Sequence, residues 1–125
     1  MPRRTRYKVN LSDAAVRDFQ RALDWSVEHF GKSARLRYAR LISQAIQDIG
    51  DNPKRPSSRK LTEPDSEGLR AYHIGLSREY VAGRRVGNPR HVLIYVFDAA
   101  AGQVDVVRIL HDTNEIRLHI PDEPL

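Results

Sequence analysis

With 125 residues, 40% of them hydrophobic and 30% charged, the chain has the length and composition of one folded domain over residues 1–125, which excludes an intrinsically disordered protein. It contains no cysteine, no apolar run near the roughly 20 residues of a membrane span and no apolar signal segment in its MPRRTRYK start. Disulfide scaffolds and transmembrane proteins are therefore excluded, and we expect a cytoplasmic protein whose net charge of +5 favours an anionic partner, either nucleic acid or an acidic protein segment.

The first predicted elements are a strand and a helix. Residues 6–12, RYKVNLS, alternate apolar and polar side chains, the pattern of a half-buried strand. Ser12 is predicted to cap the helix that follows, and Gly31 is predicted to end it. Apolar residues spaced by three and four form its predicted core face: Val16, Phe19, Leu23, Val27 and Phe30.

A second helix is predicted to begin almost at once, with Ser33 as its cap and with Gly50 and Pro53 ending it. Its apolar face comprises Ala34, Tyr38, Leu41, Ile42, Ala45, Ile46 and Ile49. So short a link predicts an antiparallel helical hairpin. Trp25 and Tyr38 are interpreted as core or boundary residues and not as ligand-stacking rings.

The second half of the chain is predicted to be strands and loops. Residues 50–68 contain three prolines and read as a surface loop, and residues 76–90 as a loop that includes at most a short ribbon. Strands are predicted over 69–75, 91–99 and 103–110, the last two forming an antiparallel hairpin. This order predicts an α+β fold, in which a helical hairpin packs on a curved, mainly antiparallel sheet.

Catalytic motifs are absent from the sequence. It has no phosphate-binding glycine loop, metalloprotease motif or nucleophile elbow, and its five histidines lack metal-ligand spacing, so we expect neither a metal nor a cofactor. Metal-independent phosphodiester cleavage needs a base, an acid and fixed positive charge. Residues of these types are Lys54, Arg55, Arg70, His73, Arg108 and His111. Purely structural roles compete with this interpretation: Arg108 as a side chain on the sheet surface, and His111 as a strand-end residue bonded to backbone.

The order of elements and several short segments together resemble the ParE/RelE superfamily of toxins from bacterial toxin–antitoxin pairs, and the ParE branch most of all. The segments are YKVNLSDAAVRDF, EHFGKSARLRYARLISQAIQDIGDNP, EGLRAYHI, HVLIYVFD and VVRILHD, and the resemblance extends from Tyr7 to Ile120. Residues 76–90 depart from the family pattern, because they are longer than its usual tight hairpin and contain four arginines.

The resemblance implies a toxin neutralised by an acidic antitoxin, whose C-terminal segment wraps the sheet and the helical hairpin. ParE-type members inhibit DNA gyrase without catalysing a reaction, and RelE-type members cut messenger RNA on the ribosome. Asp112 and Glu115, near the C-terminal end, would repel an RNA backbone, and this favours the ParE branch.

The leading hypothesis is a non-catalytic gyrase inhibitor, with antitoxin or target contacts made by Arg70, Arg84, Arg85, Arg108, His111 and Arg117. The alternative is a ribosome-dependent endoribonuclease with Arg70, Arg108 and His111 as its catalytic residues. A third possibility is a former toxin that persists only as a binding module.

Overall fold

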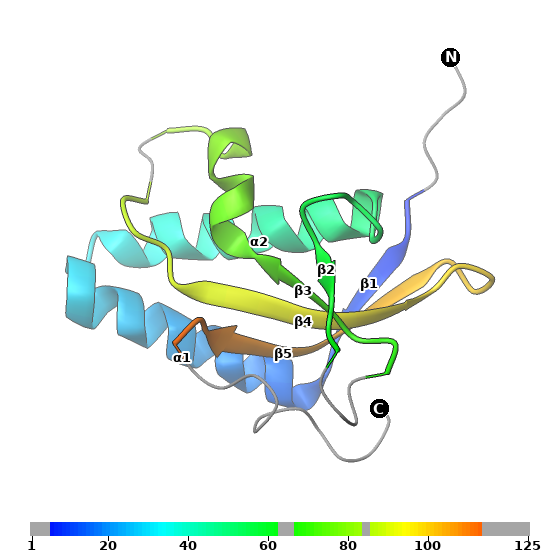
Figure 1. Ribbon diagram of the computed structural model, residues 1–125. Helices are drawn as coiled ribbons and strands as arrows, with labels where there is room; N and C mark the ends of the chain where they lie inside the picture. The colour runs from blue at the N-terminus through cyan, green and yellow to red at the C-terminus, as the bar shows by residue number, and fades with distance from the viewer. Residues whose placement is uncertain (1–5, 63–66, 84–85, 114–125) are drawn as a thin grey trace.

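The computed structural model describes residues 6–62, 67–83 and 86–113 and has the α+β architecture expected from the sequence (Figure 1). The elements in chain order are β1 (Lys8–Leu11), α1 (Asp13–Phe30), α2 (Ala34–Asp51), β2 (Arg59–Lys60), β3 (Arg70–His73), η1 (Ile74–Tyr80), β4 (His91–Asp98) and β5 (Gln103–His111). The sheet order is β1-β5-β4-β3-β2, in which β1 is parallel to β5 and the other pairs are antiparallel. In the described part of the chain, no helix is long and apolar enough to cross a membrane.

Helix α1 begins and ends where the sequence predicts. The Ser12 hydroxyl accepts a hydrogen bond from Ala15 N at 3.0 Å, and Gly31 adopts φ 87° as the helix ends. The predicted core face is wrong at Val16 and Phe30, which are 48% and 38% exposed, whereas Asp18 is buried. The helix passes over the free edge of β5 at this point, and the edge requires a polar partner.

Helix α2 has the predicted extent, beginning after Ser33 and ending before Pro53, but two of its predicted end signals act differently. Ser33 has helical backbone angles and its hydroxyl makes no capping hydrogen bond, so the predicted side-chain cap is wrong. Gly50 does not end the helix, which continues to Asp51. A Cβ atom at Gly50 would lie 2.8 Å from Val9 Cγ2, so glycine is needed there because β1 approaches the helix closely.

We expect Gly50→Ala to destabilise the protein by about 1–3 kcal/mol, because overpacking outweighs the gain of about 1 kcal/mol in helix propensity. Removing the opposing methyl groups in the double variant Gly50→Ala/Val9→Ala should relieve that overpacking. A double-mutant cycle by urea unfolding measures the coupling. If the effects of the two substitutions simply added, the close approach of β1 would not explain this glycine.

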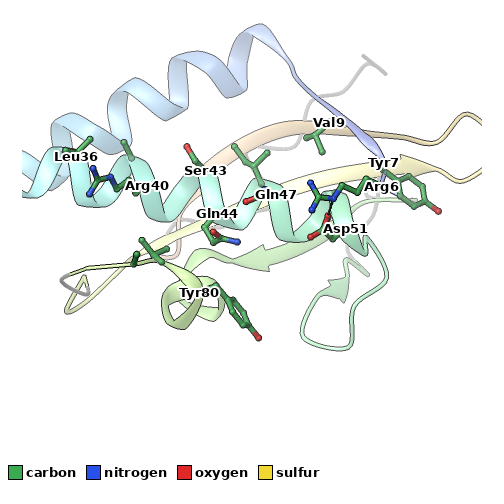
Figure 2. A pocket seen from close by; sticks show the side chains of 15 residues that line it. Arg6, Tyr7, Val9, Leu36, Arg40, Ser43, Gln44, Gln47, Asp51 and Tyr80 are labelled. Carbon is green, nitrogen blue, oxygen red and sulfur yellow. Dashed lines mark ion pairs between the residues drawn. The ribbon is translucent and has the colours of Figure 1, made fainter. Parts of the chain in front are cut away.

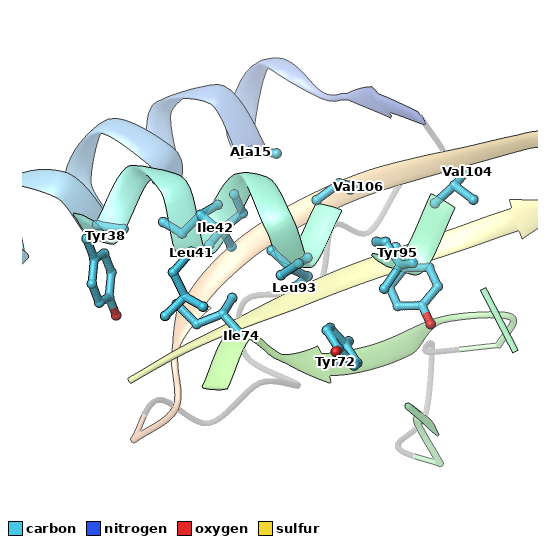
Figure 3. Packing of buried hydrophobic residues seen from close by; sticks show 14 of the residues in the cluster. Ala15, Tyr38, Leu41, Ile42, Tyr72, Ile74, Leu93, Tyr95, Val104 and Val106 are labelled. Atoms are coloured by element: carbon cyan, nitrogen blue, oxygen red, sulfur yellow. The ribbon is translucent and has the colours of Figure 1, made fainter. Parts of the chain in front are cut away.

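Apolar side chains form a cluster on each face of the sheet. The larger cluster lies between the helices and the sheet and includes Leu41 and Ile42 of α2 with Tyr72, Leu93 and Tyr95 of the strands (Figure 3). The second cluster is formed by residues that alternate with these along the strands and by two residues of the β2–β3 region: Ala71, Val92, Ile94, Val107, Leu110, Leu61 and Leu69. Burial on both faces explains why β4 reads as a nearly continuous apolar run.

Two segments predicted as loops contain regular structure. The 50–68 segment includes β2, so it is not entirely a loop. The 76–90 segment begins within η1, a 3₁₀ helix, where the sequence predicted a loop with at most a short ribbon. Buried hydrogen bonds hold η1 to α2: Ser77 donates to the Asp48 carboxylate, and the Tyr72 hydroxyl donates to Ser77 Oγ at 2.8 Å. Gln44 donates to the other Asp48 oxygen at 2.9 Å, which satisfies the buried carboxylate.

Candidate functional site

Arg108 lies on β5, at the point where β1 no longer covers the strand. A register shift opposite Ile94 and Tyr95 leaves Val107 as an extra residue in β5, and the Ser12 hydroxyl donates to the Val107 carbonyl at 2.8 Å. Beyond this bulge, the Asp18 carboxylate of α1 replaces β1 as the partner of the strand, accepting Ile109 N at 2.9 Å.

The Arg108 guanidinium forms a bidentate ion pair with the Asp18 carboxylate. Its Nε donates to Oδ2 at 2.7 Å and its Nη2 donates to Oδ1 at 3.1 Å. Asp18 is 5% exposed, and its hydrogen bonds raise the pKa of Arg108. Arg108 therefore anchors α1 to the sheet, a contact that the sequence did not predict.

Burial keeps His91 neutral at the start of β4. The Tyr38 hydroxyl accepts a hydrogen bond from Arg90 N at 3.0 Å and shares a second hydrogen bond with His91 Nδ1. Burial, with a contribution from His111, lowers the pKa of His91 to about 4, and burial raises the pKa of Tyr38 to about 12. Near neutral pH the His91 imidazole is therefore uncharged and the Tyr38 phenol keeps its proton.

Asp112 ties the end of β5 to the end of β3. His73 Nδ1 accepts Gly75 N at 3.0 Å, so Nε2 carries the proton and donates to Asp112 Oδ2 at 3.0 Å. Arg90 Nε donates to Asp112 Oδ1 at 2.8 Å. Burial alone would raise the pKa of Asp112, but these hydrogen bonds bring it below its ordinary value.

His111 lies at the end of β5 against Trp25 of α1. The indole and imidazole centroids are 5.3 Å apart, and His111 Nδ1 accepts Thr113 N at 3.2 Å. A hollow of about 300 Å³ adjoins these rings, with Arg108 and Asp18 in its wall. Trp25 and Tyr38 are boundary and core residues, as predicted.

Arg70 lies far from His111. Arg70 is opposite Tyr95 on β4, whereas His111 is opposite His91, four positions away and one strand further across the sheet. This separates the two residues by about 13 Å along the strands alone. Arg70 instead donates to Ser58 Oγ at 2.7 Å. The structure thus brings Arg108 and His111 to one end of the sheet, without Arg70.

Three of the predicted contact residues, Arg84, Arg85 and Arg117, lie outside the described residues. Within the described ranges, no three His, Asp or Glu side chains gather in a way that could hold a metal ion.

A larger hollow lies along α2, and we call it the α2 groove. It has a volume of about 1120 Å³ and is lined by α2, η1 and the start of β1. Figure 2 shows Leu36 and Arg40 of α2 on its wall, with Tyr80 of η1 nearby. Leu36 is 59% exposed and Tyr80 is 61% exposed, and the Arg6–Asp51 ion pair lies at one end.

Sequence reasoning missed the partners of the predicted residues. Asp18 is the clearest case, since it is buried although the predicted core face of α1 contains only apolar residues. The sequence pattern that could have revealed this contact has two parts. One is a carboxylate in the second turn of α1, and the other is a single arginine within β5. Such a signal becomes usable only when the parallel pairing of β1 with β5 is known.

The chain resembles known proteins in both sequence and fold. It matches the ParE toxin family of type II toxin–antitoxin systems, parDE, over residues 9–116. No curated protein matches its sequence.

Two solved toxin–antitoxin structures share the fold. A chain of the chromosomal ParDE system of P. aeruginosa superposes with a TM-score of 0.62 at 12% identity, over 86% of this chain and 97% of that one. A chain of the RelBE2 complex of Mycobacterium tuberculosis superposes with a TM-score of 0.55 at 17% identity, over 91% of this chain and 100% of that one. Because the family match spans most of its length, the chain belongs to the ParE toxin family of type II toxin–antitoxin systems.

Proposed function

We propose that this chain is a toxin that inhibits DNA gyrase by binding and is held inactive by an acidic antitoxin. The observation that carries the proposal is that Arg70, Arg108 and His111, the three residues considered as catalytic for RNA cleavage, do not converge on one site. Arg70 is about 13 Å along the sheet from His111. Arg108 is bonded to a buried carboxylate.

Charge balance at the His111 end also argues against a ribonuclease. A phosphodiester-cleaving site must stabilise added negative charge on the phosphate in its transition state. Asp18 offsets the charge of Arg108, and Asp112 offsets that of Arg90. Freeing Arg108 for a phosphate would take from the buried Asp18 its bidentate ion-pair partner and leave Arg21 at 3.9 Å, a change that costs several kcal/mol.

The α2 groove suits the antitoxin. Its wall offers exposed Leu36 and Tyr80 as apolar anchors, and Arg40 supplies positive charge at the rim. An amphipathic segment with acidic residues beside its apolar face would bury these anchors and pair with the arginine. The solved ParDE and RelBE2 assemblies are toxin–antitoxin systems, which supports a partner of this kind.

Pulse-labelling of DNA and protein synthesis just after induction without an antitoxin tests the target. We expect DNA synthesis to fall first, and the purified chain to inhibit supercoiling by purified gyrase. His111→Ala and His111→Gln should retain toxicity within tenfold, because His111 acts on no reacting atom. An early fall in protein synthesis with cut messages, together with a loss of about 100-fold or more in these variants, would establish the ribonuclease alternative instead.

A further inference from the structure

Five cationic side chains lie between the end of α2 and β3, in a region that we call the basic edge. They are Lys54, Arg55, Arg59, Lys60 and Arg70. β2 is the outermost strand of the sheet, and its Arg59 and Lys60 are opposite Ala71 and Arg70 of β3 (Figure 1). The pairing therefore places Lys60 directly opposite Arg70, so two cations lie side by side at this edge of the sheet.

The charges of the basic edge are not neutralised within the described part of the chain. None of the five side chains forms an ion pair there, whereas Arg6, Arg35 and Arg90 each pair with an aspartate. Glu67 is the one acid among the described residues from 52 to 70. The sequence also contains Glu63 and Asp65, which lie outside the described residues.

Three of the cations are held in place by neighbouring groups. The Lys54 ammonium lies 5.7 Å from the centre of the Phe97 ring, and the Arg55 guanidinium lies 5.4 Å from that of Tyr72. Arg70 is fixed by the Ser58 hydroxyl at 2.7 Å. Because these side chains are already ordered, a ligand that binds them loses less side-chain entropy.

The basic edge lacks the apolar centre that a protein interface needs. The exposed large hydrophobic residues of the described chain all lie elsewhere: Val16, Phe30, Leu36, Leu76 and Tyr80. Positive charge without an apolar core suits a phosphate backbone better than a folded protein surface.

The aromatic rings at the basic edge favour a duplex over a single strand. Single-stranded nucleic acids bind through bases that stack on exposed rings. Here the Tyr72 side chain is 1% exposed, and Lys54 and Arg55 occupy positions over the Phe97 and Tyr72 rings. Contacts to phosphates therefore remain as the main means of binding.

We propose that the basic edge binds the phosphate backbone of double-stranded DNA without sequence preference. The consequence for toxicity rests on the proposed function: the toxin would contact the DNA in the gyrase complex as well as the enzyme, from a surface separate from the α2 groove.

Salt-dependent fluorescence anisotropy with a labelled DNA duplex of mixed sequence tests the proposal directly. We expect Arg59→Glu/Lys60→Glu to weaken binding by at least about tenfold and to reduce the slope of log K against log salt by about 2. The matched control is Arg17→Glu/Lys32→Glu, which changes the net charge equally at two exposed positions outside the basic edge. Thermal unfolding verifies both variants, and Arg59→Gln/Lys60→Gln replaces the first if it fails to fold.

Equal weakening by the control variant would overturn the proposal, because net charge alone would then explain binding. Tighter binding of single-stranded RNA of the same sequence by the wild-type chain would also overturn it. If wild-type protein fails to inhibit gyrase, the proposed function fails, but the anisotropy comparison still decides the DNA site. If the wild type inhibits gyrase and the basic-edge variant inhibits it equally, DNA contact is not part of inhibition.

Discussion

Replacing Asp18 with alanine is expected to lower the free energy of unfolding by about 3–5 kcal/mol, the cost of removing one partner of a buried ion pair. The substitution leaves the Arg108 guanidinium without its bidentate acceptor and Ile109 N without its hydrogen bond. Native stabilities are about 5–15 kcal/mol, so the variant should unfold at a much lower urea concentration. Urea unfolding followed by circular dichroism measures the change.

The matched control is Asp24→Ala, on the same helix. Asp24 pairs with Arg35 at 3.0 Å, but its side chain is 70% exposed, and such pairs contribute at most about 1 kcal/mol. The double variant Asp18→Leu/Arg108→Met should recover part of the loss, since it removes both charges of the close pair, although Ile109 N still loses its acceptor. If Asp18→Ala costs no more than Asp24→Ala, the ion pair does not hold α1 to the sheet.

The second large effect is a loss of stability in acid that depends on His91. In the unfolded chain, histidine binds a proton near its ordinary pKa of 6.5, whereas burial lowers the pKa of His91 to about 4 in the folded protein. Between these values the unfolded state binds more protons, so lowering the pH favours unfolding. The loss begins below pH 6.5 and approaches about 3 kcal/mol near pH 4.

Urea unfolding at several pH values tests this expectation, with His91→Gln compared against the wild type. The variant should lose less stability between pH 6.5 and 4, and His29→Gln, at an exposed position on α1, should behave as the wild type does. The groups that face His91 are Tyr38, Trp25 and His111, and Asp112 also acts on it electrostatically. An equal acid loss in His91→Gln would assign the effect to other groups.

Local sequence patterns predicted the elements of the fold well. Alternation at Tyr7, Val9 and Leu11 indicated β1, and Ser12 and Gly31 marked the ends of α1, because each signal depends only on neighbouring residues. Ser33 and Gly50 were misread for the same reason. Ser33 is of a residue type that often caps helices, but its side chain makes no capping hydrogen bond. Gly50 is required because β1, which is distant in sequence, approaches it closely.

The candidate site was less predictable, because its contacts join residues far apart in the chain. Arg108 and Asp18 are 90 residues apart, and Tyr38 and His91 are 53 apart. Composition and periodicity contain no information on such pairs. The sequence could name Arg108 and His111 as unusual residues at a strand end, but it could not show that one of them anchors a helix.

The pairing of the first strand with the last also constrains how the protein is made. Asn10 and Asp105 are partners in adjacent parallel strands and are separated by 95 residues. At a synthesis rate of about 5–20 residues per second, β1 waits roughly 5 to 20 s for β5. The helical hairpin is translated early, yet the strand that completes its apolar contact surface is translated last. A ribosome that stops before β5 therefore releases a chain that cannot complete this sheet, so the folded toxin becomes available only after β5 has been translated.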